Sequence, residues 1–299
     1  MPRHIIYIIN PISGTRTKKG IQQLIEEKTK KAGIPFQVFP SVASADYSFL
    51  HSIIKEERIT DVVIAGGDGT VSQVVGSLMN FELDFGVIPC GSGNGLAYAA
   101  KIPIQAEKAL DIIFKGNARE TDGFYVNNCF ACMLCGLGFD ARVAHDFAQQ
   151  PQRGLTTYIR QVVKNFFSAK TYRFGIEAAN TKFETDAFFI SIANSNQYGN
   201  NFTIAPKASL SDGLLDVVIV TKQNKLNVLL KTLSQIRGKI KLLTAEEASA
   251  QKGVIYFQTE KILLHNYSNA LLHIDGDPAE TNKELNIHVK KKCFRLIQP

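Results

Sequence analysis

The chain of 299 residues lacks any apolar run that approaches the ~20 residues needed to span a bilayer, so no transmembrane helix is expected. Only five apolar residues follow His4, too few for a signal peptide. Five cysteines do not make a disulfide framework for a chain of this length. These absences predict a protein of the reducing cytoplasm, whose contact with a membrane would be peripheral.

Several motifs of nucleotide-binding proteins and hydrolases are also missing. The chain has no G-x-x-x-x-G-K-[ST] loop, no G-x-S-x-G elbow and no H-E-x-x-H helix. The run from Gly91 to Gly95 lacks the spacing of G-x-G-x-x-G, and the six histidines are too scattered for a histidine metal site. The sequence therefore argues against P-loop enzymes, serine hydrolases of the elbow type and zinc proteases.

Three cysteines, Cys129, Cys132 and Cys135, have the regular spacing of a metal cluster, but no fourth ligand follows them. The stretch is apolar and typical of a strand, on which Cys132 would face away from the other two. We interpret all three as small, buried hydrophobic side chains.

The composition is that of a folded protein with a mild basic excess. Hydrophobic residues make up 45% of the chain, and 34 Lys and Arg against 27 Asp and Glu give a net charge of +7. Such a charge suits an anionic ligand or an anionic membrane surface. No basic run is interleaved with aromatic residues, so a nucleic-acid partner is not expected.

The segment Gly66-Gly-Asp-Gly-Thr70 joins a predicted strand, 61–65, to a predicted helix, 71–79. Glycines let a backbone approach a ligand closely, and the N–H groups and positive dipole of a helix N-terminus favour phosphate. Asp68 is unexpected there, because phosphate repels a carboxylate that serves no metal ion or proton. The segment therefore predicts a phosphate site with a chemical role for Asp68.

Strands and helices alternate through the first part of the chain, which predicts a parallel sheet covered by helices. Ligands bind at the carboxyl ends of such strands, where three loops rich in Gly, Ser and Asn would meet. The predicted strands are 4–9, 36–39, 61–65 and 85–88, the helices are 46–57, 71–79, 96–101, 105–115 and one ending near Lys31, and the loops are 10–14, 66–70 and 89–95.

After residue ~122 short strands with polar connections predict an antiparallel β domain, either a sandwich or a barrel. Two amphipathic helices, 154–169 and 226–243, interrupt it, and the apolar side of the first would include Val163. Each would pack on the sheet with a solvated basic face or touch a membrane, and both interpretations stay open. The predicted strands are 125–139, 171–178, 183–193, 214–220, 253–259, 261–265 and 271–275.

Six short motifs follow one another along the chain, at 10–14, 66–70, 89–94, 136–140, 205–216 and 274–277. Through these motifs the chain resembles, over nearly its whole length, the catalytic-domain family of diacylglycerol kinases, which includes sphingosine kinases. The stretch 205–216 and the pair Asp275-Gly276 distinguish this family from NAD kinases and phosphofructokinases, which have similar GGDGT loops. The resemblance implies a phosphofructokinase-like α/β domain, 1–122, and a β-sandwich acceptor domain, 123–284, with 285–299 returning to the first domain.

The resemblance also implies ATP and Mg²⁺ as cofactors, with the active site in the cleft between the domains. Asp68 and Asp277 are the candidate catalytic carboxylates, and either one is a candidate for the base. A metal site is implied at Asp122, Ser209, Asp212 and Leu214. The implied nucleotide contacts are Asn10, Pro11, Ser13, Gly14, Ser41, Gly66, Gly67, Gly69, Thr70, Gln73, Gly91, Ser92, Gly93 and Asn94.

Three positions depart from the family pattern. Asp277 stands where Glu is usual, Gly95 stands where bacterial diacylglycerol kinases often have Asp, and Arg142 replaces an acidic residue that helps to hold the lipid head. These departures leave the acceptor lipid open. A soluble-acceptor kinase such as a NAD kinase and a non-catalytic lipid or nucleotide sensor remain alternatives, and a homodimer is left open.

Overall fold

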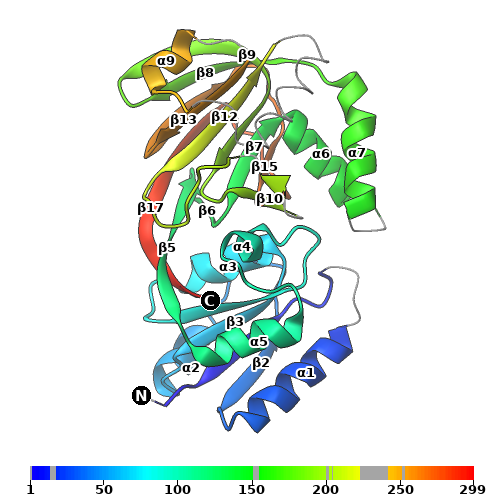
Figure 1. Ribbon diagram of the computed structural model, residues 1–299, viewed down its shortest axis with the longest axis vertical. Coiled ribbons are helices and arrows are strands. Elements are labelled where there is room, and N and C mark those ends of the chain that lie inside the picture. Colours follow the sequence, from blue (N-terminus) through cyan, green and yellow to red (C-terminus); the bar gives the residue numbers. More distant parts are fainter. Residues whose placement is uncertain are drawn as a thin grey trace.

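The protein forms two lobes stacked along its long axis (Figure 1). The computed structural model describes residues 2–13, 18–150, 155–199, 202–203, 205–222, 242–250 and 253–299. The lower lobe holds most of the helices and the parallel strands, and the upper lobe holds most of the antiparallel strands.

The N-terminal lobe is a parallel sheet in the order β4-β3-β1-β2, covered by helices on both faces. Alternate residues of β1 serve the two faces, because successive strand side chains point in opposite directions. Ile6 and Ile8 pack with α2 and α3, whereas Ile5 and Tyr7 pack with α1 and α5. The strands are β1 (Ile5–Ile9), β2 (Phe36–Pro40), β3 (Asp61–Gly66) and β4 (Asp84–Pro89), and the helices are α1 (Lys18–Lys31), α2 (Leu50–Glu56), α3 (Asp68–Leu78), α4 (Gly95–Ala99) and α5 (Ala106–Lys115).

The α/β fold predicted for this part of the chain is confirmed, with small shifts at element ends. The first helix ends at Lys31, as predicted, and Gly33 just beyond it has φ 65°. The helix expected from residue 46 begins only at Leu50, because Asp46 accepts a hydrogen bond from the Ser48 amide (2.9 Å) and forms a turn instead.

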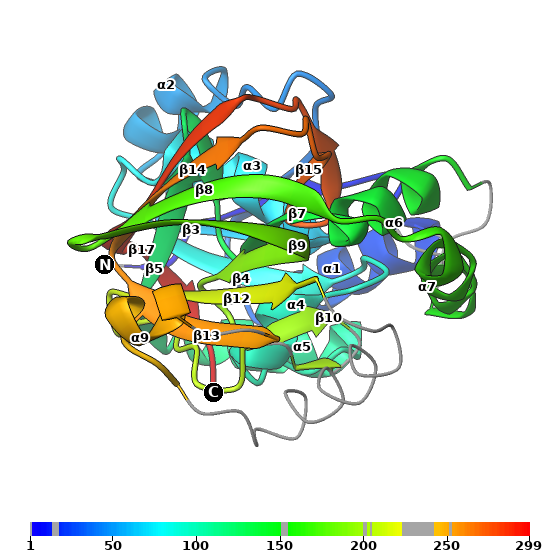
Figure 2. The same ribbon diagram turned by 90° about the horizontal axis from the view of Figure 1, so that it is seen from above.

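The C-terminal lobe is an antiparallel β-sandwich, as predicted. Its long strand β9 pairs with β8 through its first half and with β7 and β12 through its second half, so it contributes to both layers. Figure 2 looks down on β8, β9, β12 and β13. The further elements are β7 (Leu134–Gly138), α6 (Phe139–Ala148), α7 (Leu155–Ser168), β8 (Tyr172–Ala178), β9 (Thr181–Ala193), β10 (Gln197–Gly199), β11 (Phe202–Thr203), β12 (Leu215–Thr221), α9 (Ala245–Ala250), β13 (Val254–Thr259), β14 (Lys261–Asn266), β15 (Leu272–Ile274) and β16 (Asp277–Ala279).

The single strand predicted over 125–139 is wrong, since three strands occupy the region: β5 (Ala118–Val126), β6 (Cys129–Ala131) and β7. Asn127, with φ 52°, turns the chain between the first two. Cys129 is exposed, contrary to the expectation of burial, because it lies at this hairpin. Cys132 and Cys135 are buried, as expected, and burial raises the pKa of both thiols.

The expected apolar side of helix 154–169 also differs in part. In α7, Val163 is 53% exposed, whereas the polar residues Gln161 and Asn165 are buried. Asn165 donates to the Asp146 carboxylate of α6 (2.9 Å), so a polar contact joins the two helices. The helix predicted over 226–243 falls almost entirely outside the described residues.

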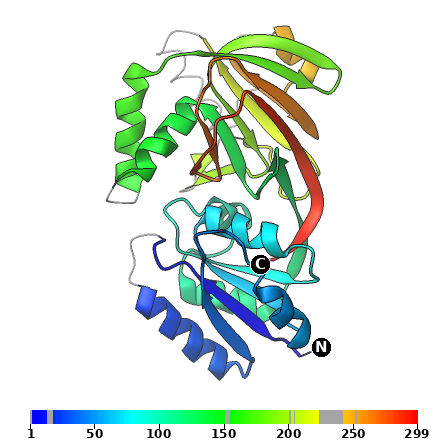
Figure 3. The ribbon, with the colours of Figure 1, turned by 180° about the vertical axis from the view of Figure 1, so that it is seen from behind.

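Two strands connect the lobes, β5 and β17 (Glu284–Ile297), which run side by side from one to the other (Figure 3). The start of β17 pairs with β14 of the sandwich, and its end pairs in parallel with β4. The pairing with β5 is interrupted between Lys290 and Phe294, and Lys292 there has φ 48°.

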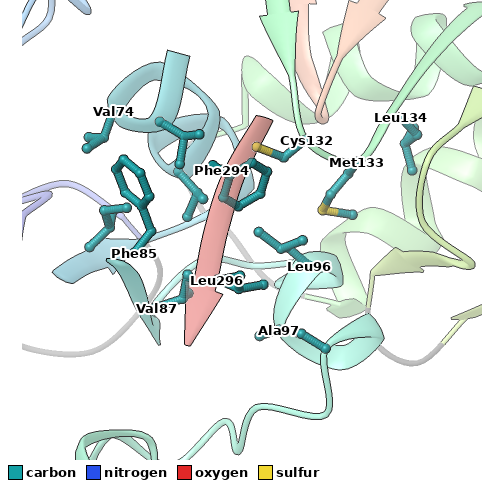
Figure 4. Close-up of a cluster of buried hydrophobic side chains, with 14 of the residues drawn as sticks. Val74, Phe85, Val87, Leu96, Ala97, Cys132, Met133, Leu134, Phe294 and Leu296 are labelled. Atoms are coloured by element: carbon teal, nitrogen blue, oxygen red, sulfur yellow. The ribbon is translucent and has the colours of Figure 1, made fainter. Parts of the chain in front are cut away.

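The seam between the lobes is a shared hydrophobic core (Figure 4). Leu96 of α4 and Phe85 of β4 lie on one side, Met133 of the β6–β7 connection lies on the other, and Phe294 of β17 lies among them. Each buried side chain of this size contributes about 1.5–3 kcal/mol, so the lobes are held in a defined orientation. This orientation brings residues distant in sequence to one site.

Candidate active site

Three loops meet at the carboxyl ends of β1, β3 and β4. The Asn10 amide donates to Ala65 (2.9 Å), and the Cys90 amide donates to Gly66 (2.8 Å). The Asn10 side chain also donates to the Thr70 hydroxyl (2.7 Å). The loops expected to bind nucleotide are therefore tied to one another at one sheet edge.

Two of these loops touch through glycines. A Cβ on Gly91 would lie 2.6 Å from the Cα of Gly67, so no larger residue fits there without separating the loops. Asn94, with φ 54°, holds Gly91 from both sides: its side-chain oxygen accepts from the Gly91 amide (2.7 Å), and its side-chain nitrogen donates to the Gly91 carbonyl (2.9 Å). These three residues thus let the two loops pack against each other, and the approach of their backbone to a phosphate stays a prediction.

Asp68 is the first residue of α3, and its carboxylate is fixed by the start of α4. Its two oxygens accept the backbone N–H groups of Gly95 (3.0 Å) and Leu96 (3.1 Å). Desolvation by burial raises the pKa of Asp68 to about 6, the two N–H groups oppose the rise, and the carboxylates of Asp275 and Asp277 add to it. Asp68 is thus an oriented carboxylate that is ionised at neutral pH and can accept a proton.

Asp277 reaches the same helix end from the other lobe. It is an exposed residue at the start of β16, yet a Cβ built on Gly69 would lie only 2.0 Å from its Oδ2. The absence of a side chain at Gly69 is therefore what lets the Asp277 carboxylate approach α3. The two carboxylates named from the sequence come together across the seam.

Asp275, which was assigned no role from the sequence, ties the lobes beneath this pair. Its buried carboxylate accepts from the Ser72 hydroxyl of α3 and from the amides of Cys132 (3.0 Å), Met133 (3.1 Å) and Leu134 (2.9 Å). Burial raises its pKa, and these donors oppose the rise. A sequence signal existed, since Asp275 belongs to the Asp-Gly pair that carried the resemblance, but its partners are too distant in sequence to be inferred.

The other expected nucleotide contacts lie around these loops, with varied exposure. Ser41 continues β2 at the same edge, where its amide donates to Ile9 (2.9 Å), and the Ser13 hydroxyl donates to the Asn10 carbonyl (3.3 Å). Pro11 is exposed, Gln73 is exposed on α3, Ser92 and Gly93 are half-buried in the 89–95 loop, and Gly14 lies outside the described residues.

The residues expected to bind metal lie near the paired strands β5 and β17, which connect the two lobes. Both carboxylate oxygens of buried Asp122 accept backbone N–H groups, from Gly213 (2.7 Å) and from Lys292 (2.6 Å), so Asp122 braces the irregular pairing in β17. Asp212 accepts from the Leu214 amide (3.0 Å), and Ser209 from the Ser211 amide (3.4 Å). Among the described residues no group of three or more His, Cys, Asp and Glu could hold a metal ion, and the magnesium role of these four residues stays a prediction.

The structure shows the surroundings of two positions that depart from the family pattern, Gly95 and Arg142. The Met133 methyl group lies 2.1 Å from a Cβ placed on Gly95, so this methionine fills the space that a side chain would need. Arg142 is exposed on α6 and forms an ion pair with Asp146 (3.5 Å), one turn along the helix.

In the described part of the chain, no helix has the length and apolar character needed to cross a bilayer.

Comparison with known proteins agrees with this arrangement. Residues 4–126 match the model of the diacylglycerol kinase catalytic domain, and residues 134–285 match the YegS C-terminal NAD kinase beta sandwich-like domain. A protein of Salmonella typhimurium described as "Probable lipid kinase YegS" is 28% identical over 249 residues, covering 81% of this chain and 79% of that protein. Its namesake in Escherichia fergusonii is 32% identical over 183 residues, covering 58% of this chain and 61% of its own length.

Solved structures are similar in fold. A diacylglycerol kinase from Bacillus anthracis strain Sterne superimposes with a TM-score of 0.74 at 15% identity, over 99% of this chain and 97% of its own. The arrangement of the two lobes is thus shared with this structure. The chain belongs to the diacylglycerol kinase catalytic-domain family, and its C-terminal lobe is of the YegS type.

Proposed function

We propose that the protein transfers the γ-phosphoryl group of Mg-ATP to the hydroxyl group of a membrane lipid, at the site formed by Asp68 and Asp277. The observation that carries the proposal is the meeting of these two carboxylates, from different lobes, at the N-terminus of α3. The family membership supports the kinase chemistry. The resemblance to lipid kinases at 205–216 and Asp275-Gly276 supports the lipid acceptor.

In the proposed mechanism Asp68 is the general base. The acceptor hydroxyl oxygen forms a bond to the γ-phosphorus, the bond between that phosphorus and the β–γ bridging oxygen breaks, and ADP leaves while the hydroxyl proton passes to Asp68. The N–H groups of Gly95 and Leu96 hold Asp68 in one orientation, and the charge of Asp277 raises its affinity for the proton. Bound with the nucleotide, Mg²⁺ would supply charge neutralisation at the phosphates.

The test is incubation with γ-radiolabelled ATP and a total lipid extract, followed by separation of organic and aqueous products. Label in the organic phase is the expected result. Label on an aqueous acceptor would indicate a soluble-acceptor kinase, and ATP binding without transfer would indicate a sensor. Either of the last two results would overturn the proposal.

The transfer rate should depend on pH through Asp68. Its pKa is raised to about 6, and only the ionised form accepts a proton, so the rate should fall as pH drops through about 6 and level off above it. Replacing Asp277 by Asn removes one of the charges that raise this pKa, so the acid limb should move to lower pH. Initial rates of label transfer between pH 5 and 8 measure the acid limb of the wild type and of the Asp277→Asn variant. If the two limbs lie at the same pH, the coupling of the two carboxylates is contradicted.

We further propose that the protein docks transiently on anionic membrane to reach its acceptor. The support is the net charge of +7 and an exposed face of α7, where Val163 stands between Arg160 and Lys164. Added salt screens such attraction, since the Debye length is ≈ 10 Å at 0.1 M. Co-sedimentation with anionic vesicles should therefore weaken as salt rises, with neutral vesicles as the control. Binding that ignores salt, or no binding, would contradict the proposal.

A further inference from the structure

A buried histidine–aspartate pair lies beside the turn that carries Asp277. His273 of β15 is 1% exposed and Asp140 of α6 is 6% exposed, and the His273 Nε2 lies 2.8 Å from the Asp140 Oδ2. Both sit over Gly136 of β7, where a Cβ would be 2.0 Å from the carboxylate and 2.6 Å from the imidazole. The pair thus has a space made for it in the sheet, and the mechanism above does not use it.

The second ring nitrogen of His273 contacts the turn itself. Its Nδ1 accepts a hydrogen bond from the Gly276 amide (3.3 Å), so the ring proton resides on Nε2 and is donated to Asp140. Asp140 therefore fixes the tautomer that the Gly276 amide requires. Two successive hydrogen bonds therefore link Asp140 of α6, through the His273 ring, to the backbone amide of Gly276 next to Asp277.

The turn that receives this contact joins β15 to β16, whose residues Ile274 and Asp277 are paired. Asp275 has φ 50° and Gly276 has φ 84°, and positive φ at both central residues is typical of an Asp-Gly hairpin turn. The Asp275 side chain anchors one end of the turn through Ser72 and the β6–β7 connection. The other end, with Asp277, is held by the pairing of β16 with β15 and by the Gly276 contact, so loss of that contact would remove one of its restraints.

Burying a carboxylate beside an imidazole is costly, and an apolar pair of similar size would stabilise a sheet core at least as well. The location of the pair beside the turn explains why it is polar, because an apolar side chain at position 273 could not accept a hydrogen bond from the Gly276 N–H. We propose that His273, oriented by Asp140, is a positioning residue that sets the Asp277 carboxylate at the N-terminus of α3. The inference rests on the proposed function, in which Asp277 takes part in phosphoryl transfer.

Two near-isosteric variants separate the two contacts of the ring. In His273→Asn the side-chain oxygen lies near the place of Nδ1 and can accept from Gly276, whereas in His273→Gln the amide nitrogen lies near the place of Nε2 and can donate only to Asp140. His273→Leu removes both. We expect kcat to fall about 10- to 100-fold in the Gln and Leu variants and only severalfold in the Asn variant, because small misplacement of a reacting group has effects of this size.

The KM for ATP should stay within about twofold in all three variants, because the nucleotide loops belong to the other lobe. His145→Gln is the matched control: His145 of α6 bonds the Leu272 carbonyl of the same strand (2.8 Å) but not the turn, and the variant should keep normal kcat. Amide hydrogen exchange of the peptide 272–279 is the second readout. It should be faster in the Gln and Leu variants than in the wild type or the Asn variant.

The outcomes are distinguishable. If the wild type transfers phosphate and the Gln variant keeps its kcat and its exchange rate, positioning by His273 is overturned. Equal losses in the Asn and Gln variants would also overturn it, since a merely structural histidine predicts them. If the wild type transfers phosphate to no acceptor, the proposed function fails, and the exchange rates alone decide whether His273 holds the turn. Should His273→Leu fail to fold, the Asn and Gln pair decides.

Discussion

Replacing Asp68 by asparagine is expected to lower the rate of phosphoryl transfer by about 10²- to 10⁴-fold, the usual contribution of a general base. An asparagine amide cannot take the proton of the acceptor hydroxyl. It also offers only one good acceptor to the two N–H groups at the start of α4, so the folded state should lose about 1–3 kcal/mol. The measurement is label transfer at saturating ATP, with thermal denaturation of the same preparation.

Asp111→Asn is the control for this variant. Asp111 is an exposed carboxylate of α5 that pairs with Lys28 of α1 at the surface, and its loss should leave transfer unchanged. Near-normal turnover by folded Asp68→Asn would remove Asp68 from the chemistry and leave Asp277 as the remaining candidate base.

Replacing Gly69 by alanine is expected to lower transfer by about 10- to 100-fold while leaving the protein at least as stable. Gly69 lies in the first turn of α3 and its φ is not in the left-handed region, so alanine suits the backbone. The added methyl group would stand 2.0 Å from the present position of the Asp277 Oδ2, and the carboxylate must move away. The variant therefore displaces Asp277 without changing its charge.

Gly20→Ala in α1 is the matched control, because a Cβ there meets nothing within 4 Å. Both alanines should raise helix stability slightly, and only the one at Gly69 should affect transfer. If Gly69→Ala keeps full activity with the wild-type melting temperature, the approach of Asp277 to α3 has no part in the reaction.

The part of the site expected to bind ATP could be predicted from the sequence, because the residue patterns that indicate it lie close together along the chain. A β-branched strand, a glycine loop and an amphipathic helix follow one another directly at 61–79, and the same order recurs at β1 and β4. Parallel pairing then brings the three loops together. Only the contacts between them, such as that of Gly67 with Gly91, needed the structure.

The junction between the lobes could not be predicted, because its contacts join residues far apart along the chain. Asp275 and Ser72 are an example, and so are Asp122 and Lys292. The alternation of apolar and polar residues also gave a wrong prediction where the chain turns. It predicted a strand that continues through Asn127, and therefore a buried Cys129, which is exposed. In α7 the apolar side expected from spacing includes the exposed Val163, since Asn165 is drawn inward by Asp146.

The proposed transfer of the γ-phosphoryl group from ATP to a lipid hydroxyl, at the site shared by the two lobes, has a simple stoichiometry. It can be measured as the amounts of ADP and radiolabelled lipid formed in one reaction with lipid vesicles. One labelled lipid should form for each ADP, and neither product should form when lipid is left out. ADP formation that is independent of lipid, with the label recovered as inorganic phosphate or on a water-soluble acceptor, would contradict the proposed transfer.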